Sequence, residues 1–244
     1  MTGWTYNVSP YKRRVGVQQK YSQNGAWTSG DGKVSSRTIQ LSQDLTAKND
    51  TDYMTLIESI AGLFYDDYTP FYLHDTDIGR RARVELESIN ETWSHGVERR
   101  MTRITVNLIM LDAFFENNNV QTISWLNAAN LGTKLVTNSG LVDAFPVITV
   151  TALANNAEFS IINQETQDSI TIGTNLFTTG IVIIIDCVNG TVTLSDGVTD
   201  LDISYAIADG TGFIFFDRGD NLLEYQSIYG NVDISIEYRP LYLF

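Results

Sequence analysis

The residues best suited to metal chemistry lie in the segment HDTD. His74, Asp75 and Asp77 offer an imidazole and two carboxylates, which are common ligands of divalent cations. On an extended strand, however, Asp75 and Asp77 share one face while His74 points to the other. Gly79 follows closely, so the pattern favours a polar loop before a strand over a metal site.

Two further segments suggest ligand binding but fit a turn better. DGVTDLD groups Asp196, Asp200 and Asp202 without the alternate-position spacing of a calcium loop, so we expect a hairpin turn, with weak calcium binding as the alternative. GAWTSGDGKVSS has phosphate-loop spacing between Gly25 and Gly30, yet aspartate follows Gly30 where lysine is required. A glycine-rich turn is the expected structure there.

Nucleophilic and acid–base catalysis find little support in the sequence. Its only histidines are His74 and His95, and no G-x-S-x-G elbow accompanies either of them. The chain has 29 acidic residues, so chance carboxylate pairs carry no weight. The single cysteine, Cys187, lies in an apolar run and is interpreted as a buried hydrophobic side chain. We therefore expect no enzymatic activity and no cofactor.

A cluster of arginines is the most distinctive group of charges. Its members are Arg80, Arg81, Arg83, Arg99, Arg100 and Arg103. They are interspersed with Glu85, Glu87, Glu91 and Glu98 on strands expected to pair. Two interpretations remain open, namely a cross-strand ladder of opposite charges on a solvated face and a salt-bridged surface between subunits.

The charge of the chain is unevenly distributed. Residues 1–116 contain 13 basic and 15 acidic residues, which gives a net charge of −2. Residues 117–244 contain 3 basic and 14 acidic residues, which gives a net charge of −11. The two parts add up to the net charge of −13 for the whole chain. An acidic second half argues against specific nucleic-acid binding and suits a surface that DNA passes without adhering. There is no signal-peptide pattern and no apolar run long enough for a membrane span, so we expect synthesis in the cytoplasm and no membrane insertion.

Hydrophobic periodicity predicts a mainly β protein in two parts. In residues 1–118 several strand patterns surround one helix, in which Tyr53, Ile57, Ile60 and Phe64 recur at helical spacing. Residues 119–144 are predicted to be a connector with a short helix near 122–129. Residues 145–238 show short apolar strands separated by turn signals, typical of a jelly-roll β-sandwich. Asn189-Gly190 and Asp196-Gly197 are predicted hairpin turns.

The sequence ends on an apolar segment. No side chain after Arg239 is charged, and the last four residues are Leu241, Tyr242, Leu243 and Phe244. Apolar side chains exposed at a chain end favour aggregation, so we expect this segment to dock on its own fold or on a partner.

A series of short motifs resembles a known family. The motifs are LIMLDAFFE (Asp112, Phe114 and Phe115), FPVITV (Pro146 and Ile148), IVIIIDC (Ile185 and Asp186), GDNLLEY (Gly219 and Asn221) and EYRPLYL (Tyr238, Arg239, Pro240, Tyr242 and Leu243). In this order and spacing they resemble the distal tail protein family of siphovirus-type bacteriophages, a hub of the tail tip or baseplate. The sequence departs from the family pattern at Ala113 and Arg218, where the family often has proline.

The resemblance implies both a fold and a structural role. It implies an N-terminal β-sandwich-like domain with one helix, and a C-terminal galectin-like jelly-roll β-sandwich over 145–238. The final strand, about 239–244, would return to the N-terminal domain, giving Leu241, Tyr242, Leu243 and Phe244 an interdomain docking role. Six copies would form a ring at the virion tail tip, with the mixed charges of residues 80–103 available for contacts between subunits.

The same resemblance implies a set of protein partners. These are the tail tube protein, a tail-tip hub or tail-associated lysin protein, and a receptor-binding protein or fibre. The alternative is a carbohydrate-binding module that binds a cell-surface glycan during host adhesion. Its candidate stacking residues are Tyr205, Tyr225 and Tyr229, since the only tryptophan of the second part, Trp125, lies in the predicted connector.

Overall fold

The computed structural model describes residues 5–8, 16–19, 26–29, 37–65, 70–93, 101–155, 158–173, 177–227 and 229–243. The chain forms two compact units. The first contains residues up to Phe115 together with Leu243, and the second contains Glu116–Tyr242. The predicted mainly β fold is confirmed, and the described residues contain one α-helix, α1 (Asp50–Tyr65), where the sequence predicted it.

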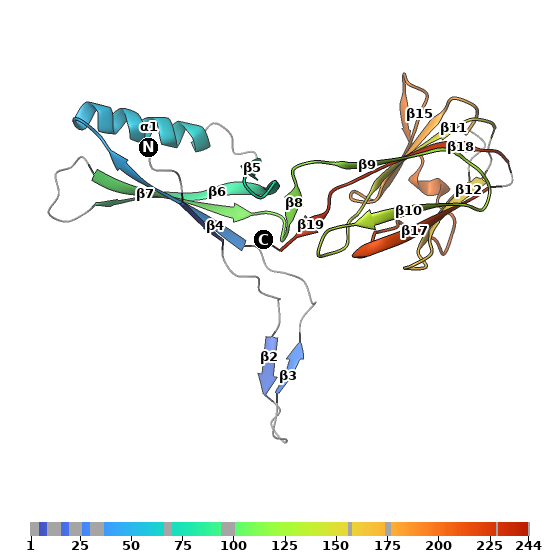
Figure 1. The fold of residues 1–244 in the computed structure, drawn as a ribbon, viewed down its shortest axis with the longest axis horizontal. Helices are drawn as coiled ribbons and strands as arrows, with labels where there is room; N and C mark the ends of the chain where they lie inside the picture. The colour runs from blue at the N-terminus through green and yellow to red at the C-terminus, as the bar shows by residue number, and fades with distance from the viewer. Residues whose placement is uncertain are drawn as a thin grey trace. The chain divides into compact units, whose positions relative to one another are not determined.

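The first sheet is built from strands distant in sequence (Figure 1). Its strands are β1 (Thr5–Val8), β4 (Arg37–Thr46), β5 (Phe71–Asp75), β6 (Arg80–Trp93), β7 (Met101–Met110), β8 (Phe115–Asn117) and β19 (Leu241–Tyr242). Their order is β1-β4-β7-β6-β8-β19, with β5 also paired to β6. Two further strands, β2 (Gly16–Gln19) and β3 (Ala26–Ser29), pair with each other.

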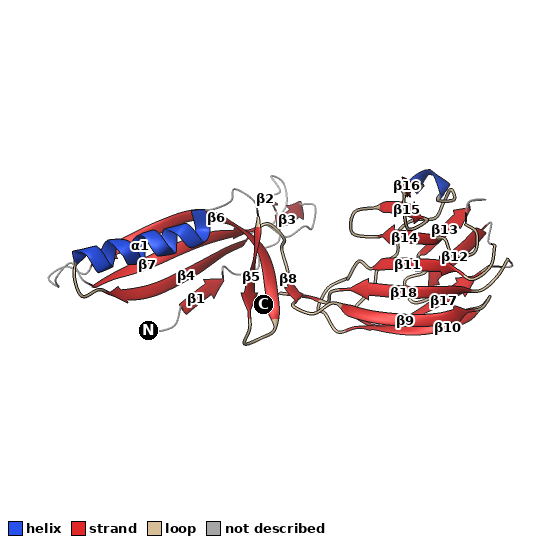
Figure 2. Ribbon diagram, turned by 90° about the horizontal axis from the view of Figure 1, so that it is seen from above, coloured by secondary structure: helices blue, strands red, loops and turns tan. Residues whose placement is uncertain are grey.

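Helix α1 lies along one face of β4, β7 and β6 (Figure 2). Asn49 caps its N-terminus, because its side-chain oxygen accepts a hydrogen bond from the backbone N–H of Asp52 at 2.8 Å. Tyr53 and Ile60 are buried beneath the helix, as the helical spacing of apolar residues predicts. The hydroxyl of Tyr53 donates to Glu91 of β6 at 2.9 Å, so a polar contact also joins helix and sheet.

The strands under α1 have one apolar and one polar face. The apolar face is formed by buried residues of β4, β7 and β6: Ile39, Leu41, Val84, Ile104, Val106, Leu108 and Met110. A β-bulge between Leu86 and Ser88 inserts Glu87 into β6. An extra residue reverses the alternation of faces along a strand, so Ser88, Asn90 and Thr92 share a face with Asn107, Thr105 and Arg103.

The second unit is a β-sandwich of antiparallel strands. Its smaller sheet has the order β10 (Gly132–Asn138), β17 (Gly219–Gln226), β12 (Glu158–Asn163) and β13 (Ser169–Gly173). Its larger sheet has the order β16 (Asp200–Asp202), β15 (Thr191–Ser195), β14 (Val182–Asp186), β11 (Val147–Ala152), β18 (Val232–Tyr238) and β9 (Gln121–Ala128). A 3-10 helix, η1 (Ser204–Ala206), follows β16. Alternate side chains of both sheets form one continuous core.

The segment predicted as a connector belongs to this sandwich. Residues 122–129 do not form the predicted short helix, because residues 121–128 are strand β9 and pair with β18. Burial of Trp125 in the core and pairing along β18 outweigh the weak helical pattern of this polar stretch. The second unit, Glu116–Tyr242, therefore includes residues 119–144.

The two hairpin turns predicted from Asn-Gly and Asp-Gly are present. Gly190 joins β14 to β15 with φ +68°, and Gly197 joins β15 to β16 with φ +86°. Both backbone conformations favour glycine, which explains why these dipeptides were informative.

Candidate functional surfaces

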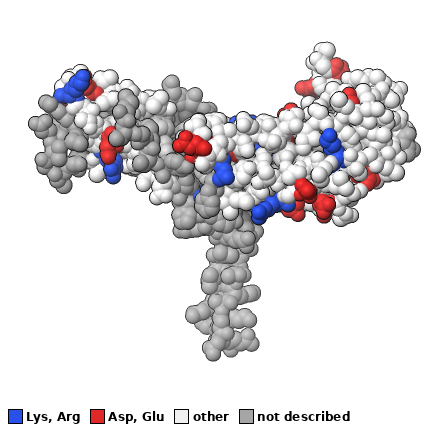
Figure 3. All heavy atoms as spheres, viewed as in Figure 1, with Lys and Arg blue, Asp and Glu red and all other residues white. Residues whose placement is uncertain are grey.

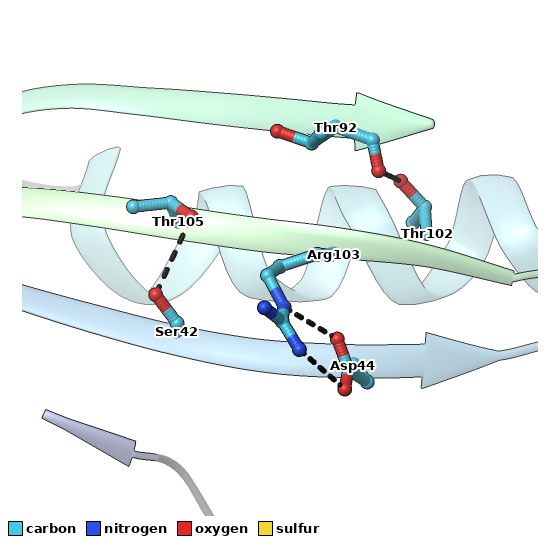
Figure 4. A network of polar contacts seen from close by, with 6 residues as sticks. All are labelled: Ser42, Asp44, Thr92, Thr102, Arg103 and Thr105. Atoms are coloured by element: carbon cyan, nitrogen blue, oxygen red, sulfur yellow. Dashed lines mark hydrogen bonds and ion pairs between the residues drawn. The ribbon is translucent and has the colours of Figure 1, made fainter. Parts of the chain in front are cut away.

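The face of the first sheet opposite α1 is a hydrogen-bonded polar surface (Figure 4). We call it the polar face and define it by Gln40, Ser42, Asp44, Ser88, Asn90, Thr92, Arg103, Thr105 and Asn107. Antiparallel pairing aligns these side chains in rows of three across β4, β7 and β6. In one row Gln40 donates to Asn107 at 3.1 Å, and Asn107 donates to Ser88 at 2.9 Å.

The two charges on the polar face neutralise each other. The Arg103 guanidinium donates to both carboxylate oxygens of Asp44, at 2.7 and 2.9 Å. The hydrogen bonds from Arg103 hold the pKa of Asp44 below its usual range. Both side chains are solvent-exposed, so the pair orders the surface but adds little to stability. The polar face therefore combines hydroxyl and amide groups with no net charge.

Among the described residues, the arginines of the cluster lie at two separate places. Arg80, Arg81 and Arg83 lie where β6 pairs with β5, whereas Arg103 pairs with Thr92 near the other end of β6. Nine positions separate Arg83 from Thr92, which at roughly 3.3 Å per residue is about 30 Å. Arg99 and Arg100 lie outside the described residues, and the role of the cluster in subunit contacts stays a prediction.

Two of these arginines make local contacts within the first sheet. Arg81 stacks over the ring of Tyr72 at 4.0 Å, a cation–π contact within the β5–β6 pair. Arg103 forms its ion pair with Asp44 of β4, rather than with a glutamate of β6.

The HDTD segment forms a turn, in agreement with the favoured interpretation. The side chain of Asp75 accepts hydrogen bonds from the backbone N–H groups of Asp77 and Ile78, at 3.0 and 3.2 Å. The segment borders an apolar groove of about 450 Å³ in the first unit, whose other lining residues include Ile39, Leu63, Phe64, Leu73 and Phe115.

The aspartates of DGVTDLD are likewise used in turns. Asp196 accepts from the N–H groups of Val198 and Thr199, both at 2.8 Å, and Asp202 accepts from Ser204 at the start of η1. Among the residues that the structure describes, no group of three or more potential ligands is arranged to hold a metal ion. Gly25, Gly30 and His95 lie outside the described residues.

The burial of Cys187 and of the candidate stacking residues decides whether each can reach a ligand. Burial raises the pKa of the Cys187 thiol to about 12, as expected for a buried hydrophobic side chain. Trp125 and Tyr225 are buried in the sandwich core, whereas Tyr205 and Tyr229 are exposed. Within the described part of the chain, no helix is long and apolar enough to span a membrane.

Residues 239–242 are held within the second unit by polar contacts. Arg239 donates to the carbonyl groups of Asn117 and Asn118, at 2.8 and 2.7 Å, and the carbonyl of Pro240 accepts from the N–H of Asn117 at 3.0 Å. The carbonyl of Leu241 accepts from the N–H of Leu141 at 2.7 Å.

The approach of Leu241 depends on a glycine. A Cβ on Gly140 would lie 2.7 and 2.8 Å from the backbone N and O of Leu241, closer than real Cβ atoms come. Buried Asn138 supports this turn, because its side chain accepts from the N–H of Gly140 and donates to the carbonyl groups of Val142 and Phe216. Sequence analysis missed both residues, although Asn-Ser-Gly is a recognisable turn signal.

Leu243 belongs to the first unit, where it contacts a buried arginine. The carbonyl of Leu243 accepts a hydrogen bond from Arg37 of β4. The Arg37 guanidinium also lies 5.8 Å from the centre of the Phe115 ring. Phe244 lies outside the described residues. The docking role predicted for the segment 241–244 stays a prediction.

Known proteins resemble this chain in sequence and in fold. Residues 139–242 match the family model described as the C-terminal domain of siphovirus-type tail components. The crystal structure of the SPP1 Dit (gp 19.1) protein aligns with this chain with a TM-score of 0.74 and 14% identity. The alignment covers 97% of this chain and 93% of that chain. That protein is described as a paradigm of the hub adsorption apparatus in phages that infect Gram-positive hosts. No curated protein matches the sequence significantly.

Baseplate structures of phage p2 align more weakly. The baseplate in its activated conformation with Sr covers 97% of this chain and 91% of that chain, with a TM-score of 0.46 and 10% identity. The same baseplate with Ca covers 98% and 91%, with a TM-score of 0.46 and 9% identity.

Proposed function

We propose that this chain is the hub of a phage tail tip. Two findings support the proposal: residues 139–242 match the C-terminal domain of siphovirus-type tail components, and the fold resembles that of the SPP1 Dit protein. In this proposal six copies form a ring that joins the tail tube to the tip proteins. The first units line a channel continuous with the tube, and the second units face outward.

The polar face is the observation that carries this proposal. A channel that conducts DNA must be hydrated, and a basic lining would retain the phosphate backbone by electrostatic attraction. The polar face offers hydroxyl and amide groups, and its one arginine is paired with Asp44. The acidic excess of the chain lies in residues 117–244, so the neutrality of this face, rather than the net charge, supports a channel role.

The partners follow from the position of such a ring. One end of the ring would contact the tail tube protein, and the other end a tail-tip hub or tail-associated lysin protein. The second units would carry a receptor-binding protein or fibre. Binding to a cell-surface glycan is the alternative function, and the exposed ring of Tyr229 is the observation that favours it.

The first test is the mass of the purified chain, measured by light scattering behind a sizing column, with negatively stained images of the same fractions. Six times the mass of one chain together with annular particles is the expected result. A strictly monomeric protein, even at high concentration and in the presence of the tail tube protein of the same phage, would overturn the ring.

A second test addresses the channel. Gln40→Lys and Asn107→Lys add positive charge to the polar face, whereas Glu58→Lys adds it to the exposed side of α1. We expect rings from all three variants, and slower DNA ejection in vitro only from phages with lysine on the polar face. Equal ejection rates for the three variants would exclude this face from the channel.

The glycan alternative is tested separately. Tyr229→Ala would reduce binding to purified host cell-wall glycan and slow phage adsorption. Unchanged glycan binding by this variant would remove the observation that favours a lectin role.

A further inference from the structure

The free edge of the larger sheet in the second unit has an unusual surface. We call residues 196–205 the acidic edge; they comprise the β15–β16 turn, β16 and the start of η1. Strand β16 is the last strand of its sheet and pairs on one side with β15. In the described part of the chain, no strand pairs with its other side.

The hydrogen-bond pattern shows which backbone groups face outward. The N–H of Ile203 donates to the carbonyl of Val192, and the N–H of Asp196 donates to the carbonyl of Thr199. These two hydrogen bonds lie on either side of the pair formed by Leu194 and Leu201. Hydrogen-bonded pairs alternate along an antiparallel ladder, so the N–H and C=O groups of Leu201 point toward β15. Those of Asp200 and Asp202 therefore point away from the sheet, where an added strand would find them.

Exposed apolar side chains accompany this open edge. Val198 is 90% exposed, Tyr205 is 78% exposed and Leu201 is 48% exposed. Single exposed apolar residues are ordinary, but three within ten residues on an unpaired strand edge form a surface suited to a partner.

The charge around the edge has a single sign. Residues 135–217 contain ten acidic residues and no lysine, arginine or histidine. Figure 3 shows red and no blue around the projection that carries β15 in Figure 1. Hydrogen bonds from Val198, Thr199 and Ser204 fix the carboxylates of Asp196 and Asp202, and they hold the pKa of both groups below the usual range. These aspartates cap turns, so the charge is preorganised rather than gathered around a cation.

We propose that the acidic edge binds an extended basic segment of a protein partner, which adds to β16 as a further strand. Main-chain hydrogen bonds to Asp200 and Asp202 would provide affinity, while lysine or arginine side chains meet the aspartates and apolar side chains contact Leu201 and Tyr205. Charge excludes DNA and anionic lipid as occupants, and it disfavours a second copy of this edge. Only the identification of the partner as a tail component rests on the proposed function; the binding chemistry does not.

The probe is a short fluorescein-labelled peptide that alternates lysine and valine, with a glutamate–valine peptide for comparison. Binding to the full chain is measured by fluorescence anisotropy, and amide hydrogen exchange is followed over residues 199–203. We expect saturable binding of the basic peptide alone, slower exchange at Asp200 and Asp202, and weaker binding in about 0.3 M salt.

Variants separate edge pairing from general attraction. Asp200→Pro removes an outward-pointing N–H group, and proline is tolerated on the free edge of a sheet. The double variant Asp200→Asn with Asp202→Asn removes two negative charges but keeps the side-chain oxygens that accept hydrogen bonds in the turn. Each is expected to weaken peptide binding by about tenfold or more. The matched controls are Leu135→Ser and Asp220→Asn, which change an exposed apolar and an acidic residue on the smaller sheet. They should change the Kd by less than about twofold.

Three results would overturn the proposal. The first is equal weakening in the controls, which would indicate charge attraction without a site. The second is undiminished binding to both the Asp200→Pro and the double asparagine variants. The third is association of the protein with itself that Asp200→Pro abolishes, which would make a second copy the occupant. A chain that stays monomeric yet binds the peptide at this edge would refute the ring without refuting this inference.

Discussion

Arg37 donates a hydrogen bond to the carbonyl of Leu243, although 206 positions separate the two residues. Arg37 is 2% exposed, and burial lowers the pKa of its guanidinium. A buried cation needs acceptors, because removing one leaves an uncompensated desolvation penalty. The contact therefore gives Leu243 a structural role in the first unit.

Ending the chain at Tyr242 should destabilise the first unit. The lost acceptor is worth about 1–3 kcal/mol, and Arg37→Met should reduce that cost because no cation then needs the carbonyl. The measurement is urea unfolding of the full and shortened chains in both backgrounds. Equal costs of shortening in the two backgrounds would show that Arg37 and Leu243 are not coupled.

Gly140 is the residue on which the position of Leu241 depends. Gly140→Ala should destabilise the second unit by about 1–3 kcal/mol, because the added Cβ overlaps the Leu241 backbone. Gly212→Ala is the control, since its Cβ would meet nothing within 4 Å. Thermal unfolding measures the cost, and faster proteolysis after residue 238 in Gly140→Ala alone would locate it. Indistinguishable unfolding of the two variants would contradict the proposed contact.

Much of the fold could be predicted because its signals are local. The spacing of Tyr53 and Ile60 identified α1, and Asn-Gly and Asp-Gly identified the turns around β15. The motif order led to the distal tail protein family. In agreement with it, residues 139–242 match the C-terminal domain of siphovirus-type tail components, and nearly the whole chain has a fold similar to that of the SPP1 Dit protein.

What could not be predicted depends on tertiary pairing. Strand β9 exists because Trp125 enters the core and β18 supplies a partner, and neither fact is local. The burial of Arg37 could not be predicted, since its contacts with Phe115 and Leu243 come from distant parts of the sequence. The bulge at Glu87 determines which side chains of β6 join the polar face, and a one-residue shift leaves no clear signal.

Two glycines of the first unit should respond to alanine with opposite signs. Gly62 lies within α1 and Gly79 in the β5–β6 turn, and a Cβ on either would meet nothing within 4 Å. Gly62→Ala should stabilise the unit by about 0.5–1 kcal/mol, because alanine is the better helix former. Gly79 has φ +67°, so Gly79→Ala should cost about 1 kcal/mol or more. Urea unfolding of both variants tests the signs, and stabilisation by both would show that the turn conformation is wrong.

The thiol of Cys187 should be unreactive while the sandwich is folded. Its pKa is raised from 9.0 to about 12, chiefly by burial, which lowers the thiolate fraction at pH 8 by about 10³-fold. We expect reaction with Ellman's reagent to be at least about 100-fold slower in buffer than in concentrated urea. The absorbance of the released thionitrobenzoate measures both rates. Fast reaction in buffer would mean that the core around Cys187 opens readily.

The contact between Tyr53 and Glu91 should make the first unit lose stability at high pH. Burial, and then the hydrogen bond to Glu91, raise the pKa of Tyr53 from 10.0 to about 12. The folded state thus binds this proton more tightly than the unfolded state, so the associated stability is complete below pH 10 and is lost as pH rises through 12. Tyr53→Phe should cost about 1 kcal/mol at pH 7, because Glu91 loses a donor, and should flatten the decline between pH 10 and 12.

Glu91→Gln separates the causes, because it keeps an acceptor but removes the negative charge. The decline should still begin near pH 10 but should end at a lower pH and be smaller, and it should not vanish, since burial of Tyr53 remains. Urea unfolding of the three proteins across this pH range makes the comparison. If Tyr53→Phe and the unchanged protein lost stability in parallel above pH 10, the decline would have to come from other groups, and the hydrogen bond between α1 and β6 would have no part in it.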